Sequence, residues 1–553
     1  MSYLLQKSIS REQSYCYLSS LQAWQHGIQA IFYHGVPFSA RNNYQAALQH
    51  VGLIETIFSQ RGVSGPFEIL ECGSPHGMLS KFILDILKDK HPIIYKNVIV
   101  TISDFSHAST QLFEQSQFVK PHLGVLQFVS HFSDQKASDT YDYIFYNYNY
   151  CCFPSRHLEI SQDGIYEWEV ETYLNDGVEC VCFDFQSDLG TYFKSLSIDE
   201  LICAFQQDPA GFIRDYSAGL APFIEEKFSK KLIKDPDFLT YLSSFRSVFT
   251  DGDRFNFSVE AIDHLKSIVQ KLKPWGALLF SDCTFKAGRQ NRAVVPVDAL
   301  VTYQENLIYF PIHFKSLLSA LPDSVGSSFV HYDAESLVDC FVCHDLYSDV
   351  YQSVFKQSFR PDPLKKIRKA LSDMGQTTDE SQLMSIYDSF DESMRKDYYL
   401  TQFALQRALR HQWHSFARDL SVYFYDLFKE FAFDHFRVIG SLPSNGCSFD
   451  SLLEGCLMKS VELCPEDLGL VLSYVQLLIQ SGDREQAIDC IEKALFLNRI
   501  FYSKEVAVDP ILLEVMRFLS FLYRLEQNSD KEEPLQVILD CFEGKSDLNM
   551  ISV

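Results

Sequence analysis

The stretch that decides the fold runs from Phe67 to Asp104 and reads FEILECGSPHGMLSKFILDILKDKHPIIYKNVIVTISD. It begins with a short apolar run, and a loop carrying Gly73 and Gly77 follows. Residues 78–88 then place apolar side chains at i, i+3, i+4 and i+7, a spacing that predicts a helix. A β-branched run at 98–103 ends directly before the final acid. A strand, a helix and a second strand in this order predict a parallel βαβ unit.

The same kind of pattern continues over much of the chain. The first 60 residues look helical, as do residues 109–117 and 261–272. Further strands are predicted from short runs of apolar, β-branched and aromatic residues at 125–129, 141–150, 157–160, 166–173, 178–185, 277–280, 329–331 and 339–344. Strands that alternate with helices predict an α/β fold with a doubly wound, mostly parallel sheet.

Domain organisation follows from a change of pattern at about residue 355, beyond which amphipathic helices replace the strand signals. We predict a sheet-containing domain at 1–350 with a helical insert at about 190–260, a helical linker region at 351–440, and an all-α domain at 441–553. Within the last, Gly482, Ala487 and Ala494 lie where a tetratricopeptide repeat has its small residues, and this segment resembles one such hairpin. An ordinary helical bundle is the alternative.

Composition limits the classes of function. The chain has 553 residues, with 48 Lys and Arg against 72 Asp and Glu, which gives a net charge of −24. This acidity argues against nucleic acid as a partner, because phosphate backbones are bound by clustered Lys and Arg. The chain begins without the apolar segment of a secretory signal, and no apolar run approaches the roughly 20 residues that cross a bilayer. We therefore expect a cytoplasmic protein without membrane insertion.

The fifteen cysteines are scattered and odd in number, which is typical of buried, reduced thiols. Cys340, Cys343 and His344 have the spacing of haem attachment or of half a zinc site. Haem attachment requires an exported chain, and a zinc site requires a second pair of ligands. Since the surrounding residues alternate like a buried strand, we predict a strand here and no metal site.

The loop after the first strand points to a nucleoside cofactor. Gly73 and Gly77 allow a ligand to approach the backbone, and the N-terminus of the following helix adds partial positive charge. Asp104, at the end of the next strand, can accept hydrogen bonds from both hydroxyls of a ribose. The cofactor could be a dinucleotide or S-adenosylmethionine.

Three features favour S-adenosylmethionine. The loop reads E-x-G-x-x-x-G rather than G-x-G-x-x-G, and the acid follows it by about 27 residues instead of roughly 20. In addition, LKPWGALLF at 272–280 resembles the turn and fifth strand of class I S-adenosylmethionine-dependent methyltransferases.

A narrower resemblance is carried by four motifs in order. They are the loop itself, the Asp85-Ile86-Leu87 and Pro92-to-Tyr95 segment, the run NYNYCCFPSR at 147–156, and Asp163-Gly164 with the acids that follow. These motifs are similar to those of the MidA-like methyltransferases, a family that includes a protein arginine methyltransferase of mitochondrial complex I assembly.

This resemblance implies roles for named residues. Glu71, Gly73, Ser74, Gly77 and Asp104 would bind S-adenosylmethionine. Asn147 and Asn149, at the end of the fourth strand, would orient the methyl acceptor, which in the family is a protein arginine. The C-terminal helices would recruit the protein substrate or partner.

The chain also departs from the family pattern. Pro75 replaces the middle glycine of the loop, and Tyr148 and Cys151 replace two acids. Pro lacks an N–H and fixes φ, so the loop must differ in shape. The alternative function is therefore a catalytically degenerate methyltransferase-like scaffold that binds a partner. An NAD-dependent oxidoreductase is a third possibility.

Overall fold

The computed structural model describes most of the chain, in two compact units that are treated separately below. The described ranges are 2–25, 43–62, 65–73, 77–104, 117–129, 140–185, 192–283, 363–411, 467–502 and 508–543, most of 302–359, and isolated residues elsewhere. One unit comprises Ile9–Val170 and Phe228–Phe431, and we call it the sheet unit. The other comprises Met1–Ser8, Glu171–Lys227 and Ala432–Val553, and we call it the helical unit.

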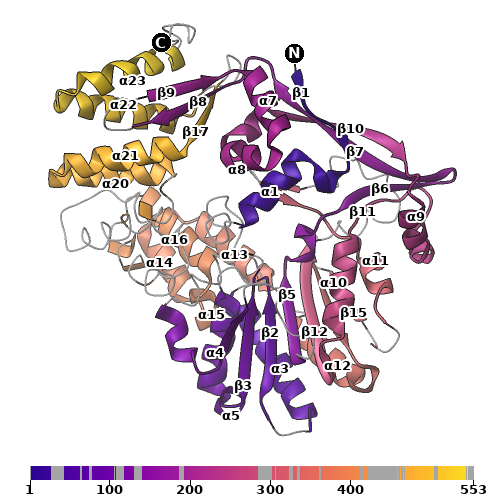
Figure 1. Ribbon diagram of the computed structural model, residues 1–553. Helices are drawn as coiled ribbons and strands as arrows, with labels where there is room; N and C mark the ends of the chain where they lie inside the picture. The colour runs from indigo at the N-terminus through magenta and orange to yellow at the C-terminus, as the bar shows by residue number, and fades with distance from the viewer. Residues whose placement is uncertain are drawn as a thin grey trace. The chain divides into compact units, whose positions relative to one another are not determined.

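The sheet unit is built on a seven-stranded sheet with the strand order β15-β16-β12-β5-β2-β3-β4 (Figure 1). Strand β16 is antiparallel to both of its neighbours, and the other neighbouring pairs are parallel. The strands are β2 (Phe67–Cys72), β3 (Val98–Ser103), β4 (Leu126–Val129), β5 (Tyr141–Asn147), β12 (Leu272–Cys283), β15 (Ser328–Tyr332) and β16 (Leu337–Cys343). The predicted α/β fold with a mostly parallel sheet is confirmed.

Helices cover both faces of this sheet. Strand β5 shows why, because its successive side chains alternate between the faces. Tyr143 donates or accepts a 2.8 Å hydrogen bond with His50 of α3 (Tyr44–Gln60), whereas Tyr146 packs on the other face against His264 of α10 (Val259–Val269). Both faces of the strand are therefore apolar, as expected of a parallel strand inside an α/β/α arrangement.

The remaining elements of the sheet unit surround this core. Strand β6 pairs antiparallel with β11 and with the first part of β7. The bounds of the remaining elements of the sheet unit are α1 (Tyr15–Gln25), α4 (Met78–Lys90), α5 (Pro92–Tyr95), β6 (Arg156–Ser161), β7 (Gly164–Asn175), α9 (Pro236–Ser243), β11 (Arg254–Phe257), β13 (Thr302–Gln304), β14 (Leu307–Tyr309), α11 (Phe314–Ser319), α12 (Ser348–Phe359), α13 (Pro363–Gly375), α14 (Glu380–Asp388), α15 (Glu392–Arg395) and α16 (Tyr398–Arg410).

The helical unit combines helices with a small antiparallel sheet of order β17-β8-β9. Helices α20 and α21 form a hairpin around Gly482, whose φ of +88° ends the first helix. Glu492 of α21 accepts hydrogen bonds from Tyr523 (2.6 Å) and Lys531 (2.8 Å) of the following two helices. The elements are β8 (Glu179–Asp184), β9 (Tyr192–Leu196), α7 (Ile198–Gln207), α8 (Pro209–Leu220), α20 (Leu468–Ser481), α21 (Arg484–Leu497), β17 (Arg499–Tyr502), α22 (Pro510–Leu525) and α23 (Ser529–Phe542).

Several local predictions need correction. The first residues form strand β1 (Ser2–Ile9), not a helix, and β17 lies among the C-terminal helices where no strand was expected. The 195–260 region is mostly helical but also contains β10 (Ile224–Leu232) and β11. Residues 272–276 belong to β12 itself, with a register shift between Leu272 and Ala277 that accommodates the proline.

The strand predicted at 141–150 ends at Asn147, and a left-handed turn at Tyr148 follows it. Strand β16 confirms the buried strand around Cys340 and Cys343. The predicted helix at 109–117 lies almost wholly outside the described residues. The domain boundaries near residues 350 and 440 and the tetratricopeptide identity of the α20–α21 hairpin stay predictions.

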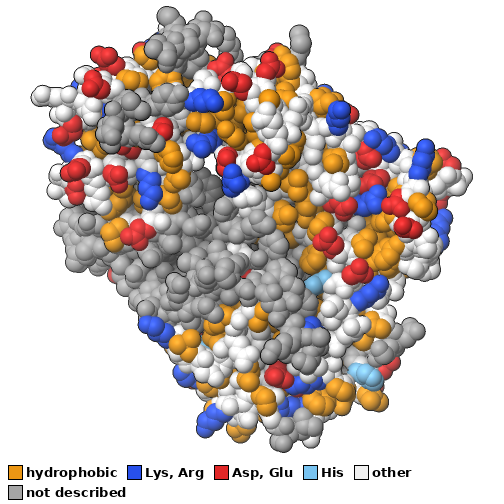
Figure 2. Space-filling view, in the orientation of Figure 1, with side chains coloured by type: hydrophobic (Ala, Val, Ile, Leu, Met, Phe, Trp, Pro, Cys, Tyr) orange, Lys and Arg blue, Asp and Glu red, His pale blue; other side chains and the backbone are white. Residues whose placement is uncertain are grey.

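The surface of the described residues carries charges of both signs. Acidic and basic side chains are interspersed among apolar ones on the face shown in Figure 2. Among the helices that the structure describes, none is both long enough and apolar enough to span a bilayer.

Candidate functional site

Gly73 follows strand β2 and opens the loop before α4. Its φ of +68° lies in the left-handed region, which glycine adopts without strain. A Cβ atom here would lie 3.3 Å from Cγ of Asn149, so the absence of a side chain allows the chain after β5 to come close. The Gly73 N–H donates to the Ser103 carbonyl at 2.9 Å. The carboxyl end of β2 therefore contacts the ends of both neighbouring strands.

Gly77 lies at the other end of the same loop. It is the N-cap of α4 and has a φ of +58°, again in the left-handed region. The side chain that a helix normally uses to cap its first turn is absent at this position, so the backbone at the helix start can be approached by a ligand. The predicted site residue Ser74, together with Pro75 and His76, lies outside the described residues.

Two buried acids lie beside the loop. Glu71 is 4% exposed and accepts a hydrogen bond from the Ser80 hydroxyl of α4. Asp104, directly after β3, accepts the Ser106 N–H at 2.7 Å. Burial raises the pKa of Asp104 from 3.8 to about 7, the Ser106 N–H opposes this shift, and the Glu71 carboxylate adds to it. Asp104 is thus a hydrogen-bond acceptor held near its titration point at neutral pH.

The chain after β5 makes a strained turn at the same edge. Asn147 ends the strand opposite Ser281 of β12, and Tyr148 then takes a φ of +55°, which is uncommon for a residue with a side chain. The Tyr148 N–H donates to the Ser281 carbonyl at 2.8 Å, which holds this conformation. Asn149 precedes a 3-10 turn, η4 (Tyr150–Cys152). Backbone strain of this kind is concentrated at functional sites.

Asp282 lies at this edge too and was not among the predicted site residues. It is 1% exposed, and its carboxylate accepts the N–H groups of Tyr150 (2.6 Å), Cys151 (3.2 Å) and Cys283 (2.7 Å). Burial raises its pKa from 3.8 to about 6, although these donors and the Cys151 thiol oppose the shift. The sequence carried the same signal as for Asp104, an acid at the carboxyl end of a buried strand.

The outer motif residues are engaged elsewhere. Asp85 Oδ1 lies 2.9 Å from Nε2 of His122, whose Nδ1 lies 2.9 Å from the Tyr95 hydroxyl. Arg156 binds Glu167 through Nε at 3.0 Å and stacks on Phe238. These contacts link α4 to α5 and the turn before β4, and β6 to β7 and α9. The motif residues therefore have structural roles that the sequence could not reveal.

The structure brings most of the predicted site residues together. Glu71, Gly73 and Asp104 lie at the carboxyl ends of β2 and β3, and Asn149 joins them by its contact with Gly73. Asn147 lies one strand further, between β5 and β12. This arrangement has its centre between β2 and β5, where successive connections leave the sheet in opposite directions, and such a switch point is where open α/β sheets bind ligands.

Comparison with known proteins gives distant structural neighbours. No protein-family model and no curated protein matches the chain. An uncharacterised protein from Burkholderia thailandensis is 11% identical, with a TM-score of 0.36, over 60% of this chain and 93% of that one. A member of the same superfamily from that organism, bound to S-adenosyl-homocysteine, is 10% identical with a TM-score of 0.37, over 61% and 96%.

A third neighbour is an O-methyltransferase family protein from Burkholderia thailandensis. It is 8% identical with a TM-score of 0.26, over 57% of this chain and 59% of that one. At this distance neither fold nor activity is transferred from these proteins, and the functional conclusion rests on strand order and the residues above.

Proposed function

We propose that the chain binds S-adenosylmethionine at the carboxyl edge of the seven-stranded sheet and transfers its methyl group to a protein side chain. The observation that carries this proposal is the joining of Gly73, Asp104 and Asn149 at the switch point between β2 and β5. Glu71, Gly73, Gly77 and Asp104 are the residues suited to the cofactor, with Ser74 in the same loop.

Strand order separates this cofactor from a dinucleotide. The strands of the sheet can be numbered 1 to 7 in chain order, so that β2 is 1, β5 is 4, β12 is 5 and β16 is 7. From β4 to β15 they then lie side by side in the order 3-2-1-4-5-7-6, and strand 7 is antiparallel to the others. The dinucleotide-binding fold instead has six parallel strands in the order 3-2-1-4-5-6. An antiparallel strand inserted beside the fifth is the arrangement of class I methyltransferases, the class that the sequence resembles. An oxidoreductase is therefore the weaker interpretation.

The residues of this chain would act mainly by positioning. Bound S-adenosylmethionine supplies a methyl group on a positively charged sulfur, ready for in-line displacement. Asp104 would accept hydrogen bonds from the ribose hydroxyls, and Glu71 holds the start of α4 in place through Ser80. Asn149 would orient the acceptor nitrogen, and its side chain lies close to Gly73, with Cγ and Nδ2 at 3.3 and 3.4 Å from the position of an added Cβ atom.

The residues expected around the methyl acceptor differ from those of the family. An arginine acceptor, as in the family, is protonated at neutral pH and requires carboxylates or carbonyls around it. Tyr148 and Cys151 replace two acids that the family has there. This substitution favours the second candidate function, a scaffold that retains the cofactor-binding edge without transferring the methyl group.

The helical unit is proposed to recruit the protein partner. A hollow on α21 is lined mainly by acids, namely Asp483, Glu485, Asp489 and Glu492, with Lys531 of α23 at its edge. An acidic surface attracts basic segments of other proteins, and a segment that carries an arginine acceptor is of this kind. The helices here form successive hairpins linked through Glu492, as an array of tetratricopeptide type would.

Calorimetry with S-adenosyl-homocysteine tests the cofactor site. The full chain should bind one equivalent with a Kd below about 1 mM, and Asp104→Asn should weaken binding about 10- to 100-fold, since hydrogen bonds to a charged acceptor contribute about 1.5–3 kcal/mol. The control is Asp263→Asn, which changes an exposed acid and should leave the affinity unchanged. Absence of heat with the wild-type chain at millimolar ligand contradicts the proposal.

A transfer assay separates the enzyme from the scaffold. The full chain is incubated with tritiated S-adenosylmethionine and a protein extract, and labelled residues are identified after hydrolysis. Radioactive methylarginine that disappears with Asn149→Ala supports transfer to arginine. Cofactor binding without any labelled protein supports the scaffold instead.

A further inference from the structure

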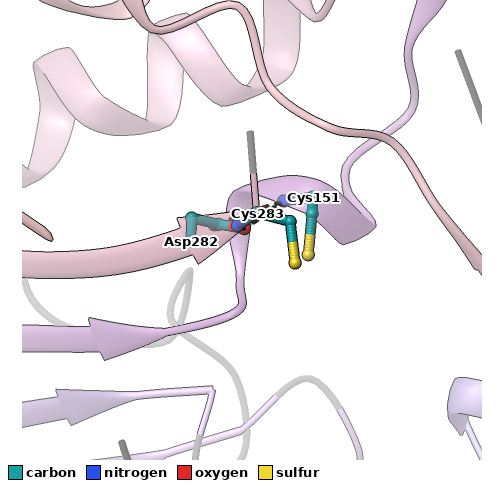
Figure 3. A group of neighbouring side chains, drawn as sticks. All are labelled: Cys151, Asp282 and Cys283. Carbon is teal, nitrogen blue, oxygen red and sulfur yellow. Dashed lines mark hydrogen bonds between the residues drawn. The ribbon is translucent and has the colours of Figure 1, made fainter. Parts of the chain in front are cut away.

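A group of thiols and one carboxylate lies where β5 and β12 end. Among the residues that the structure describes, Cys151, Asp282 and Cys283 have side-chain ligand atoms that all lie within 4.8 Å of one another. Figure 3 shows the two sulfur atoms side by side, with the carboxylate of Asp282 beside the same turn. Cys151 is fully buried and Cys283 is partly buried. The group is therefore largely shielded from water.

The electrostatics of this group call for a cation. The partners of the Asp282 carboxylate are the backbone N–H groups of Tyr150, Cys151 and Cys283 and the thiol of Cys151, and all of them are neutral. A buried carboxylate is costly unless a positive charge compensates it or it takes up a proton. Loss of the Cys151 thiol proton on metal binding would free an acceptor position on this carboxylate for the ion.

The spacing of the thiols fits a tetrahedral ion. The ligand atoms of Cys151, Asp282 and Cys283 all lie within 4.8 Å of one another, whereas Cys152 is outside this group although its Sγ lies 4.0 Å from that of Cys151. Two thiolates bound to one zinc ion at about 2.3 Å are separated by about 3.8 Å. Soft sulfur ligands select zinc over magnesium or calcium, which prefer six or more oxygen ligands.

We propose that Cys151, Asp282 and Cys283 bind a zinc ion, with the fourth position of the ion open to a water molecule or another ligand. Each thiol loses its proton to solvent as the ion binds, so that the bound sulfurs are thiolates. The ion would join the turn after β5 to the end of β12 and hold Asn149 against Gly73. The proposal does not depend on methyl transfer, since a structural zinc site would be equally present in a scaffold.

Metal analysis of the full-length protein tests the site. The protein is purified with a non-thiol reductant, loaded with zinc chloride, freed of excess ion and measured by mass spectrometry. We expect about one zinc per chain, and with cobalt in its place an absorption band of thiolate-to-cobalt charge transfer. Cys283→Ser should lower the zinc content at least about threefold and remove part of that band. The matched control is Cys203→Ser, which removes an exposed thiol of α7.

A second variant keeps the outcome decisive if Cys283→Ser folds poorly. Asp282→Asn retains the shape of the side chain and one acceptor oxygen but removes the charge, and it should weaken zinc binding at least about tenfold. The proposal is wrong if the loaded wild-type chain holds no zinc, or if both variants keep their zinc. It is equally wrong if dissolved oxygen, added after the reductant is removed, oxidises Cys151 and Cys283 to a disulfide as fast in the zinc-loaded protein as in the zinc-free protein. Calorimetry with S-adenosyl-homocysteine, on zinc-loaded and zinc-free protein, separates failure here from failure of the cofactor site.

Discussion

The two ends of the seven-stranded sheet treat their buried acids in opposite ways. At the amino end, Asp142 is fully buried, and it accepts hydrogen bonds from Lys273 Nζ (2.8 Å), Trp275 Nε1 (2.6 Å) and the Glu68 N–H (2.7 Å). At the carboxyl end, the hydrogen bonds that hold Asp104 and Asp282 come from neutral donors, namely backbone N–H groups and the Cys151 thiol. One end compensates its charge with a cation and contributes to stability, whereas at the other end the donors among the described residues are neutral, and perturbed carboxylates of this kind are typical of functional sites.

The largest expected effect comes from breaking the compensated end. Asp142→Ala leaves Lys273 largely buried with only the partly exposed Glu68 as a partner, and we expect a loss of about 3–5 kcal/mol in the free energy of unfolding. Urea denaturation measures this loss. Glu68→Gln is the control and should cost less than about 1 kcal/mol. A loss below 1 kcal/mol for Asp142→Ala would remove the proposed difference between the two ends.

Removing the charge of a buried acid at the carboxyl end should raise the free energy of unfolding instead of lowering it. Because the folded-state pKa of Asp104 is raised to about 7 from 3.8, the folded chain binds more protons than the unfolded chain between these values, so its stability falls as pH rises through that window. Asp104→Asn removes this cost, and we expect it to stabilise the chain at pH 8 by about 2 kcal/mol relative to pH 4. Thermal unfolding at both pH values measures the change. Equal destabilisation at both pH values would show that folding does not raise the pKa of Asp104.

A pair of glycines offers a smaller and sharper comparison. At Gly276, at the amino end, a Cβ atom would meet the Tyr141 carbonyl at 2.9 Å, and the backbone cannot yield easily. At Gly73 the obstacle is the Asn149 side chain at 3.3 Å, together with a φ of +68°. We expect Gly276→Ala to cost about 2 kcal/mol without changing intrinsic affinity for S-adenosyl-homocysteine.

The matching change at the carboxyl end should separate stability from binding. Gly73→Ala should lower the free energy of unfolding by only about 1 kcal/mol, the usual size of left-handed strain in a residue with a side chain. It should also weaken the binding of S-adenosyl-homocysteine. Denaturant midpoints and calorimetry on both variants test the pair. Equal affinity loss in the two variants would argue against a ligand site beside Gly73.

How much of this could be read from the sequence depends on how local each signal is. Strand β2, helix α4 and strand β3 were predictable because periodicity, glycines and a closing acid all lie within one short stretch. Strand β17 was not, since its four residues become a strand only by pairing with β8. The register shift that allows Pro274 inside β12 likewise depends on β5.

The site shows the same division. Gly73 and Asp104 were proposed from their own motif and lie at the carboxyl edge of the sheet as expected, and the position of Asp282 could have been found by the same reasoning about strand ends. The close approach of Asn149 to Gly73 was beyond sequence reasoning, because it depends on the left-handed Tyr148 and its hydrogen bond to Ser281. Charge compensation of Asp142 by Lys273 and Trp275 was equally hidden, as the partners lie on another strand.

The pairing of β17 with β8 also has a consequence for synthesis of the chain. Residues 179–182 leave the ribosome roughly 300 residues before their partners at 499–502, and contacts of such long separation form late. Until then one edge of β8 presents unpaired N–H and C=O groups, which are a template for pairing with another chain. A nascent chain therefore has to be protected at this edge, and a fragment that stops before Arg499 would carry it permanently.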